Sequence, residues 1–560
     1  MKAALLLFLV VGVAAGCRMP PPRQAATLIV TNARVWTGEP GRPSAEAIAI
    51  AGDRIAAVGS SPDVDGWRGP DTRVIDAGGA RVLPGFNDSH VHFVTGGLQL
   101  DSVDLRDAAT PAEFARRIGE RAARTPAGEW MLGGDWDDQL WSPPALPTAR
   151  LIDAVTPATP VFVNRFDEHM ALANSVAMKL AGVTSATPDP PGGVIVRDTA
   201  GQLTGIFKDA AMGLIYRVIP PLSRDRRVQA VKRALAHAAS LGVTSLRDMG
   251  PDPADLALYA ELAERGELTA RISTAPFETQ WDDQAKLGIR RGFGTPLLRL
   301  GAVKGFADGS LGSTTAYFFE PYTDAPATRG LLADEMIPLD GMRTRLSGAD
   351  AAGLQLCIHA IGDRAISIVL DLFADVDRAN GPRDRRFRIE HAQHVAPKDF
   401  ERFARLNVIA AVQPYHAIDD GRWAERRIGP ERIKTTYPFR TFLDRHVRIA
   451  LGSDWPVAPL SPLWGIYAAA TRATLDGKHP GGWVPEQKIS VEEAVSGYTA
   501  GSAYAEFADG EKGRLSAGMF ADLVILSEDI LAIEPSRIKE AAVSTTIAGG
   551  RVVYARAPSR

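Results

Sequence analysis

The 560-residue sequence predicts an α/β protein: a (β/α)8 TIM barrel, a small β-sandwich built from both termini, and a long insertion after the first barrel strand. Three observations predict this fold. Short strand-like runs occur at both ends of the chain. Strands alternate with amphipathic helices in its centre, which is typical of parallel α/β architecture. The central strands number eight, as in a closed parallel barrel.

The N-terminal segment is expected to be an export signal rather than part of the fold. Residues 1–17 contain one lysine, an apolar run too short to span a bilayer, and small residues that end at Cys17. This ending resembles a bacterial lipoprotein signal, in which Cys17 is lipidated; cleavage after Ala15 and a buried N-terminal helix are the alternatives. The Pro-rich residues 18–26 read as a tether. We therefore expect an exported protein, periplasmic or anchored to a membrane only through this lipid.

Both termini contain strand patterns. "LIVTNARVW", "AIAIAGDRIAAVG" and "RVIDA" follow the tether, and "ADLVILSED" and "AVSTTIAGGRVVYAR" lie near the other end, the last as a hairpin around Gly549-Gly550. Neither end has enough strands for a closed core of its own. Residues 27–83 and 505–560 are therefore predicted to form one β-sandwich.

Residues 84–504 contain the predicted barrel. Helical patterns such as residues 226–241 and 364–379 lie between the strands. An insertion of about residues 99–222, rich in Trp and in Pro-Gly turns, separates the first two strands, and a segment that long is usually functional or a domain of its own. The eight predicted strands are "RVLPGFND", "GVTSLRDMG", "TARISTAPF", "LRLGAVKGFAD", "LQLCIHA", "RFRIEHAQ", "NVIAAVQP" and "VRIALGSDW".

The carboxyl ends of these strands carry residues that can bind a metal. Functional groups of parallel barrels gather at this rim, and alternation along a strand places the two histidines of "PGFNDSHVHF" on one face. Imidazole and carboxylate together suit zinc or a similar divalent ion, at one or two per protomer. The predicted rim set is His90 and His92 (first strand), Lys304 (fourth), His359 (fifth), His391 (sixth) and Asp454 (eighth).

The motifs "PGFNDSHVH", "VKGFADGSLGS", "IHAIGDRA", "RIEHAQ" and "GSDWP" resemble those of the metal-dependent amidohydrolase superfamily, in particular its amidohydrolase 3 branch. The resemblance implies that His90, His92 and Asp454 bind one ion and that His359 and His391 bind a second. It also implies that Lys304 is carboxylated and bridges the two. In the alternative, an unmodified Lys304 pairs with Asp308 over a single ion.

The resemblance further implies hydrolysis of a non-peptide, amide-like C–N bond of a small molecule by a metal-activated hydroxide, with Asp454 as the proton shuttle. "HAIGDRA" has no Glu after His359, which disfavours deamination. Ester or lactone hydrolysis, and a surface lipoprotein that binds a ligand without catalysis, are the alternatives. The balanced net charge of −3 gives no reason to expect nucleic acid as a partner, and a homo-oligomer is possible.

Substrate contacts are expected from the insertion and from the loops at the rim. For each candidate the alternative is a structural hydrogen-bonding role. His394 is read as structural, and His237, His446 and His479 are not expected at the site. The candidates are Arg165, Asp167, His169 and Asn174 in "VNRFDEHMALANS", and Asp308, Gln413 and His416 just past strand ends.

Overall fold

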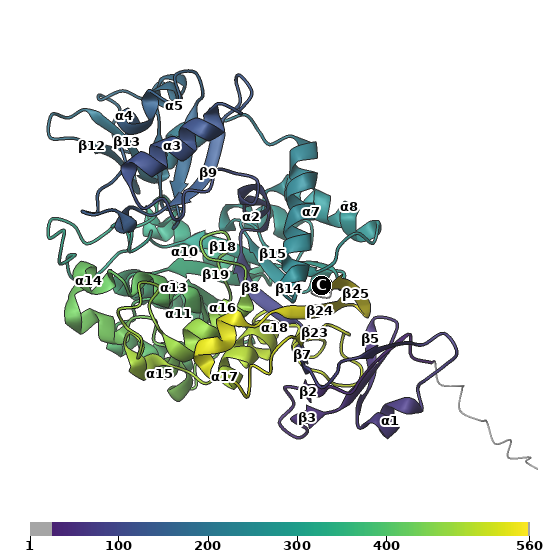
Figure 1. The fold of residues 1–560 in the computed structure, drawn as a ribbon. Coiled ribbons are helices and arrows are strands. Elements are labelled where there is room, and N and C mark those ends of the chain that lie inside the picture. Colours follow the sequence, from purple (N-terminus) through teal and green to yellow (C-terminus); the bar gives the residue numbers. More distant parts are fainter. Residues whose placement is uncertain (1–24, 558–560) are drawn as a thin grey trace, which may run out of the picture.

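The computed structural model describes residues 25–557, which form an α/β fold with five sheets (Figure 1). The terminal strands lie at the lower right of Figure 1 and the insertion at the upper left, with the central sheets and their helices between them. Within residues 25–557, no helix combines the length and the apolar character needed to cross a bilayer. The predicted signal, Cys17 and most of the tether lie outside the described residues.

Strands from both ends of the chain share one six-stranded sheet. Its order is β25 (Arg551–Ala555), β24 (Val543–Ala548), β23 (Leu523–Leu526), β7 (Arg81–Pro84), β2 (Arg34–Trp36) and β3 (Ser44–Ala45). A four-stranded sheet contains only N-terminal strands: β5 (Arg54–Gly59), β4 (Ala47–Ala51), β1 (Leu28–Thr31) and β6 (Arg73–Asp76). Buried side chains of both sheets, among them Ile48 and Ile525, belong to one apolar cluster.

Each of the eight predicted central runs contains a strand, and these strands form two five-stranded sheets. One sheet has the order β16 (Phe293–Gly294), β17 (Leu298–Leu300), β15 (Arg271–Ala275), β14 (Val243–Met249) and β8 (Phe86–Val91). The other has the order β18 (Ala302–Phe306), β19 (Gln355–Ala360), β20 (Arg388–His391), β21 (Ile409–Val412) and β22 (Ile449–Leu451). All pairs are parallel except β16 with β17. Isolated parallel bridges, Phe277 to Lys304 and Val91 to Trp455, connect the two sheets.

Two predicted strands are each divided at a glycine. The first predicted run becomes β7 in the terminal sheet and β8 in the central sheet, and Gly85 lies between them. A Cβ at Gly85 would lie 2.2 Å from the Thr244 hydroxyl oxygen, so the close approach requires glycine. The fourth run breaks at Gly301, whose φ of 114° is a conformation that residues with a Cβ rarely adopt.

The helices between the central strands largely follow the predicted patterns. The two runs singled out above form α7 (Arg224–Ser240) and α11 (Asp363–Asn380), and the Ser223 hydroxyl oxygen caps α7 by accepting from the Arg226 amide. Helix α7 packs against α2 (Phe93–Gln99), and α11 packs against α10 (Leu339–Ala351). Further helices are α8 (Pro253–Glu264), α13 (Pro414–Asp420), α14 (Ala424–Arg432) and α16 (Pro462–Thr471).

The insertion has its own sheet and its own apolar clusters. The sheet order is β12 (Gly193–Arg197), β13 (Leu203–Asp209), β11 (Met170–Ala173), β10 (Val161–Arg165) and β9 (Met131–Trp136). Helices α3 (Pro111–Ala122), α4 (Ala149–Asp153), α5 (Ser175–Ala181) and α6 (Gly213–Tyr216) accompany it. Two clusters of buried side chains, one around Trp136 and one around Phe162, consist of insertion residues. The insertion is therefore a folded unit, and its β10–β11 hairpin carries residues 166–169 at its tip.

Candidate active site

The six rim residues predicted from the sequence lie together where the central strands end. His90 is the penultimate residue of β8, and His92 is the N-cap residue of α2. Lys304 lies in β18, His359 in β19 and His391 at the end of β20, while Asp454 follows β22. All are buried except His92, whose side chain is 23% exposed.

His90 and His92 both direct Nε2 toward Asp454 because their Nδ1 atoms are engaged elsewhere. The His90 Nδ1–H donates to Glu390 Oε2 at 2.7 Å, and the His92 Nδ1–H donates to the Met249 carbonyl at 2.9 Å. The two Nε2 atoms lie 3.3 Å and 3.4 Å from Asp454 Oδ1. Such outer partners fix the tautomer and the ring orientation of metal-ligating histidines.

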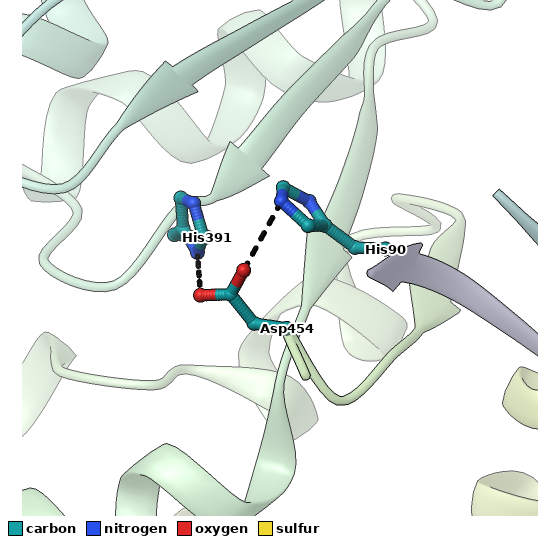
Figure 2. Close-up of side chains that lie close together, drawn as sticks. All are labelled: His90, His391 and Asp454. Carbon is teal, nitrogen blue, oxygen red and sulfur yellow. Dashed lines mark ion pairs between the residues drawn. The ribbon is translucent and has the colours of Figure 1, made fainter. Parts of the chain in front are cut away.

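His391 approaches Asp454 from the other side (Figure 2). Its Nδ1 lies 3.9 Å from Asp454 Oδ2 and donates to Gln413 Oε1 at 2.9 Å. His90, His391 and Asp454 each offer one ligand atom, and these atoms lie within 4.8 Å of one another. This compact set combines two residues of the first ion site that the family resemblance implies, His90 and Asp454, with one of the second, His391.

His359 and Lys304 complete the cluster. The His359 ring centroid lies 4.5 Å from that of His391, and its Nε2 donates to the Gly309 carbonyl at 3.2 Å. Lys304 Nζ lies 3.4 Å from His90 Nε2. Both Asp308 oxygens accept backbone N–H groups, from Tyr317, Ile361 and Gly362, and the alternative pairing of Lys304 with Asp308 stays a prediction.

The electrostatics of the cluster keep its ligands in the forms that bind a cation. Burial lowers the pKa values of His90, His359 and His391 well below the usual range, so these imidazoles are neutral. Burial raises the pKa of Asp454, but His90 and His92 outweigh it, and the net pKa is lowered. Burial also lowers the pKa of Lys304. Metal ligands must be deprotonated, and neutral imidazole with carboxylate is the donor set of zinc sites.

Asp454 provides the test of whether a metal fits here. Its Oδ1 is buried and has no hydrogen-bond partner among the described residues, although two imidazole nitrogens lie near it. A buried carboxylate oxygen without a partner is costly. Asp454 also has a φ of 63°, uncommon for a non-glycine residue and typical of strained functional positions. These residues fit a divalent cation.

Comparison with known proteins places this site in a family. A sequence model of the amidohydrolase family matches residues 73–554. The chain belongs to the amidohydrolase family. This amidohydrolase is accordingly an enzyme, a hydrolase that acts on carbon–nitrogen bonds.

Relatives resemble the amidohydrolase over nearly its whole length. It is 40% identical over 551 residues to Protein LONG AFTER FAR-RED 3 of Arabidopsis thaliana, covering 96% of this chain and 93% of the relative. It is 28% identical to the N-substituted formamide deformylase of Arthrobacter pascens, covering 96% and 100%. The crystal structure of an uncharacterized metal-dependent hydrolase from Pyrococcus horikoshii OT3 is 29% identical, with a TM-score of 0.74 and 91% and 99% coverage.

A cavity of about 140 Å³ opens beside the metal ligands of the amidohydrolase. Four substrate candidates line it: Arg165, Asp167, His169 and His416. The His169 Nδ1–H donates to Asp209 Oδ1 at 2.6 Å, and His416 Nε2 lies 3.9 Å from Asp454 Oδ2.

The other three candidates do not line this cavity. Gln413 orients His391, and Asp308 holds backbone N–H groups, as described above. Asn174 is fully buried as the N-cap of α5, where Oδ1 accepts from Ala177 and Nδ2 donates to Thr156 Oγ1. The structure thus gives Asn174 a structural role, as the hydrogen-bonding alternative predicted. His237, His446 and His479 are also absent from the cavity lining, as expected.

Three residues of the site did not emerge from the sequence. Glu390 contacts His90 from 300 residues away, although it stands in the quoted motif "RIEHAQ". Glu168 lines the cavity from the tip of the β10–β11 hairpin, with a positive φ of 58°. Phe306 follows Lys304 by two residues, so strand alternation could have placed it on the same face.

Proposed function

We propose that this amidohydrolase cleaves a non-peptide, amide-like C–N bond of a small molecule, using one or two divalent ions, with zinc as the native metal. The observation that carries the proposal is the partnerless Asp454 Oδ1 between the Nε2 atoms of His90 and His92. The N-substituted formamide deformylase among its relatives supports an amide of low complexity as the substrate.

The residues that would hold the metal are His90, His92, His391 and Asp454, with His359 and Lys304 available for a second ion. A divalent ion at this site supplies Lewis acidity toward the amide oxygen and a water of lowered pKa. We further propose that Lys304 is carboxylated, because a buried ammonium 3.4 Å from His90 Nε2 would repel any cation that His90 binds.

The protein's own residues orient the substrate and move the proton. Asp454 Oδ1 lies 3.3 Å and 3.4 Å from Nε2 of His90 and His92, and Asp454 would take one proton from the attacking water and return it to the leaving nitrogen. Glu390 and the Met249 carbonyl keep His90 and His92 in one tautomer. The hairpin residues Glu168 and His169 line the cavity together with His92 and Asp454 and would contact the substrate.

Two finer features of the fold and the location belong to the same proposal. The parallel bridges from Phe277, which follows β15, to Lys304 and from Val91 to Trp455 support closure into a (β/α)8 barrel. The shared apolar cluster supports a sandwich of the two terminal sheets. We propose that residues 1–17 direct export and that Cys17 carries a lipid anchor, on the strength of the sequence pattern alone.

The decisive experiment combines metal analysis with a substrate screen. The protein, purified without chelators, should contain about one to two zinc ions per protomer and should hydrolyse N-substituted formamides or other simple amides. Removal of the metal should abolish turnover, and added zinc, manganese or cobalt should restore it. A fully metallated enzyme that hydrolyses only esters or lactones would contradict the proposed reaction, and a protein that neither contains nor responds to metal would contradict the site.

A further inference from the structure

A second and larger cavity adjoins the first. Its volume is about 260 Å³, and Glu168, His169 and Phe306 line both cavities. Phe306 connects them closely, because its ring centroid lies 5.2 Å from that of His359 and 4.6 Å from Lys304 Nζ. A group that leaves the metal-ligand cluster past Phe306 therefore enters this second cavity, which we call the outer chamber.

Much of the wall of the outer chamber is apolar. Phe306 and Leu332 contribute large side chains, Met212 and Tyr216 come from the insertion, and Ala210 and Ala333 leave room between them. A cavity of about 150 Å³ with apolar walls can take a benzene ring. The outer chamber therefore has space for a substituent larger than one aromatic ring, whereas the first cavity, about 140 Å³, is crowded by polar groups.

The ionisable groups of the outer chamber are almost all acidic. Glu168, Asp209, Asp308, Asp334 and Glu335 line it, whereas its lining contains no Lys or Arg. His169, the one basic group, is already bound to Asp209. The chamber thus presents an incoming carboxylate with acidic neighbours and no free cation.

The local electrostatics also disfavour negative charge in the outer chamber. Burial and the neighbouring Glu278 raise the pKa of Glu335 to about 8, although Glu335 Oε2 accepts from the Phe306 amide at 2.8 Å. An environment that disfavours the charge of its own carboxyl groups disfavours a further anion in the same way.

We infer that the outer chamber binds the larger substituent of the amide substrate and selects an uncharged, mainly apolar group over an anionic one. This inference rests on the proposed amide hydrolysis and adds the substrate class: amides of neutral arylalkyl or alkyl groups rather than N-acyl amino acids. The apolar wall supplies the burial energy, and an acidic lining without a free cation supplies the discrimination.

Matched substrates test the inference on the wild-type, metal-loaded enzyme. Three formamides are compared by kcat/KM: an N-arylmethyl formamide, its analogue with a carboxylate on the ring, and N-methylformamide. A second series, of N-methyl arylacetamides, places the aryl group on the acyl side of the amide instead of on the nitrogen. In the series with the higher kcat/KM values, we expect kcat/KM for the neutral aryl compound to exceed that for the small amide and that for the carboxylate analogue by at least about tenfold. Equal kcat/KM values for the neutral and anionic compounds would overturn the inference.

Gly213 allows the chamber to be altered with little risk to the fold. It lines the chamber, begins α6 with a helical φ of −57°, and an added Cβ would meet no heavy atom within 4 Å. Gly213→Phe should raise KM for the aryl compound by about tenfold and leave N-methylformamide within about twofold. Gly213→Lys should narrow the gap between the carboxylate analogue and the neutral compound.

Gly66 provides the matched control. It also has a helical φ, of −62°, and open space for a Cβ, but it ends α1 (Ser61–Asp65) in the terminal region. Gly66→Phe and Gly66→Lys should change no substrate ratio. If Gly213→Phe lowers kcat/KM equally for large and small amides, the chamber does not hold the substituent, while amide hydrolysis still stands. If no amide of any size is turned over, the proposed function itself fails.

Discussion

Glu390 offers a way to separate the folding role of a buried ion pair from its role in metal binding. Its carboxylate and the Arg388 guanidinium are both fully buried, with Arg388 Nε 2.7 Å from Glu390 Oε1, while Oε2 accepts from His90 Nδ1 at 2.7 Å. Glu390→Leu removes the partner of Arg388 and the acceptor of His90 together. Breaking a buried pair on one side costs about 3–5 kcal/mol.

The loss of the hydrogen bond to His90 has a separate, smaller effect. Removing an outer partner of a metal-ligating histidine costs about 10–100-fold in metal affinity, or about 1.4–2.7 kcal/mol. We therefore expect Glu390→Leu to lower the free energy of unfolding of the metal-free protein by about 3–5 kcal/mol and to weaken zinc binding by about 10–100-fold. Urea unfolding measures the first effect, and competition with a chromophoric chelator measures the second.

The Arg388→Met/Glu390→Leu variant distinguishes the two effects. Replacing both charges by apolar groups leaves no uncompensated charge, so most of the stability should return. Zinc affinity should stay low, because His90 Nδ1 still has no acceptor. If Glu390→Leu binds zinc within about threefold of the wild type, well short of the expected loss, then Glu390 does not orient His90 and our account of the site is wrong at this point.

Three further variants test the roles of Asp454, Lys304 and Cys17. Asp454→Asn should lower turnover by at least about 100-fold but lower the metal content much less, both measured on the same preparation. A parallel loss of turnover and metal would leave Asp454 without a separate role in proton transfer. Lys304→Ala should contain less metal, measured by mass spectrometry, and should recover part of its activity with short carboxylic acids and added metal. Full metal content and activity would exclude Lys304 as a bridge between two ions. Cys17→Ser should move the exported protein from the membrane fraction to the soluble fraction, and unchanged fractionation would show that Cys17 is not the anchor.

The sequence could predict that the six rim residues lie together, because their positions follow from local rules. Each rim residue stands at or just beyond the end of a strand-like run, and parallel strands place such ends at one edge. The two histidines of "SHVH" illustrate the limit of that rule. His90 still belongs to β8, whereas His92 already caps α2, and both reach Asp454 because the chain turns there.

What the sequence could not give are contacts between distant segments. Glu390 reaches His90 only because β20 and β8 lie close in space, and nothing local distinguishes it from a solvent-facing glutamate. The division of the first strand at Gly85 likewise depends on the close approach of Thr244, from β14. The outer chamber also depends on contacts between distant segments, because its walls combine the insertion with the loops after β18.

Buried charges hold the tip of the insertion hairpin over the site. Arg165 is fully buried and pairs with Asp138 at 2.7 Å and Asp167 at 2.8 Å. Burial lowers the pKa of Arg165, but these carboxylates outweigh it and raise the pKa overall. Asp167 also accepts from Ser310 and Ser313, which lie in the segment after β18. The hairpin is thus joined to the central fold through one carboxylate.

A second connection runs from the insertion to the segment after α13. Asp137 accepts from Arg422 at 2.8 Å and lies 3.8 Å from Arg165, so the same cluster of charges spans both sides of the cavity. Lifting the tip away from the central fold would break the Asp137–Arg422 pair and the two serine hydrogen bonds of Asp167, while Arg165 would keep its partners within the insertion. These contacts oppose displacement of the tip, so we expect Glu168 and His169 to line the two cavities as a fixed wall rather than as a moving lid.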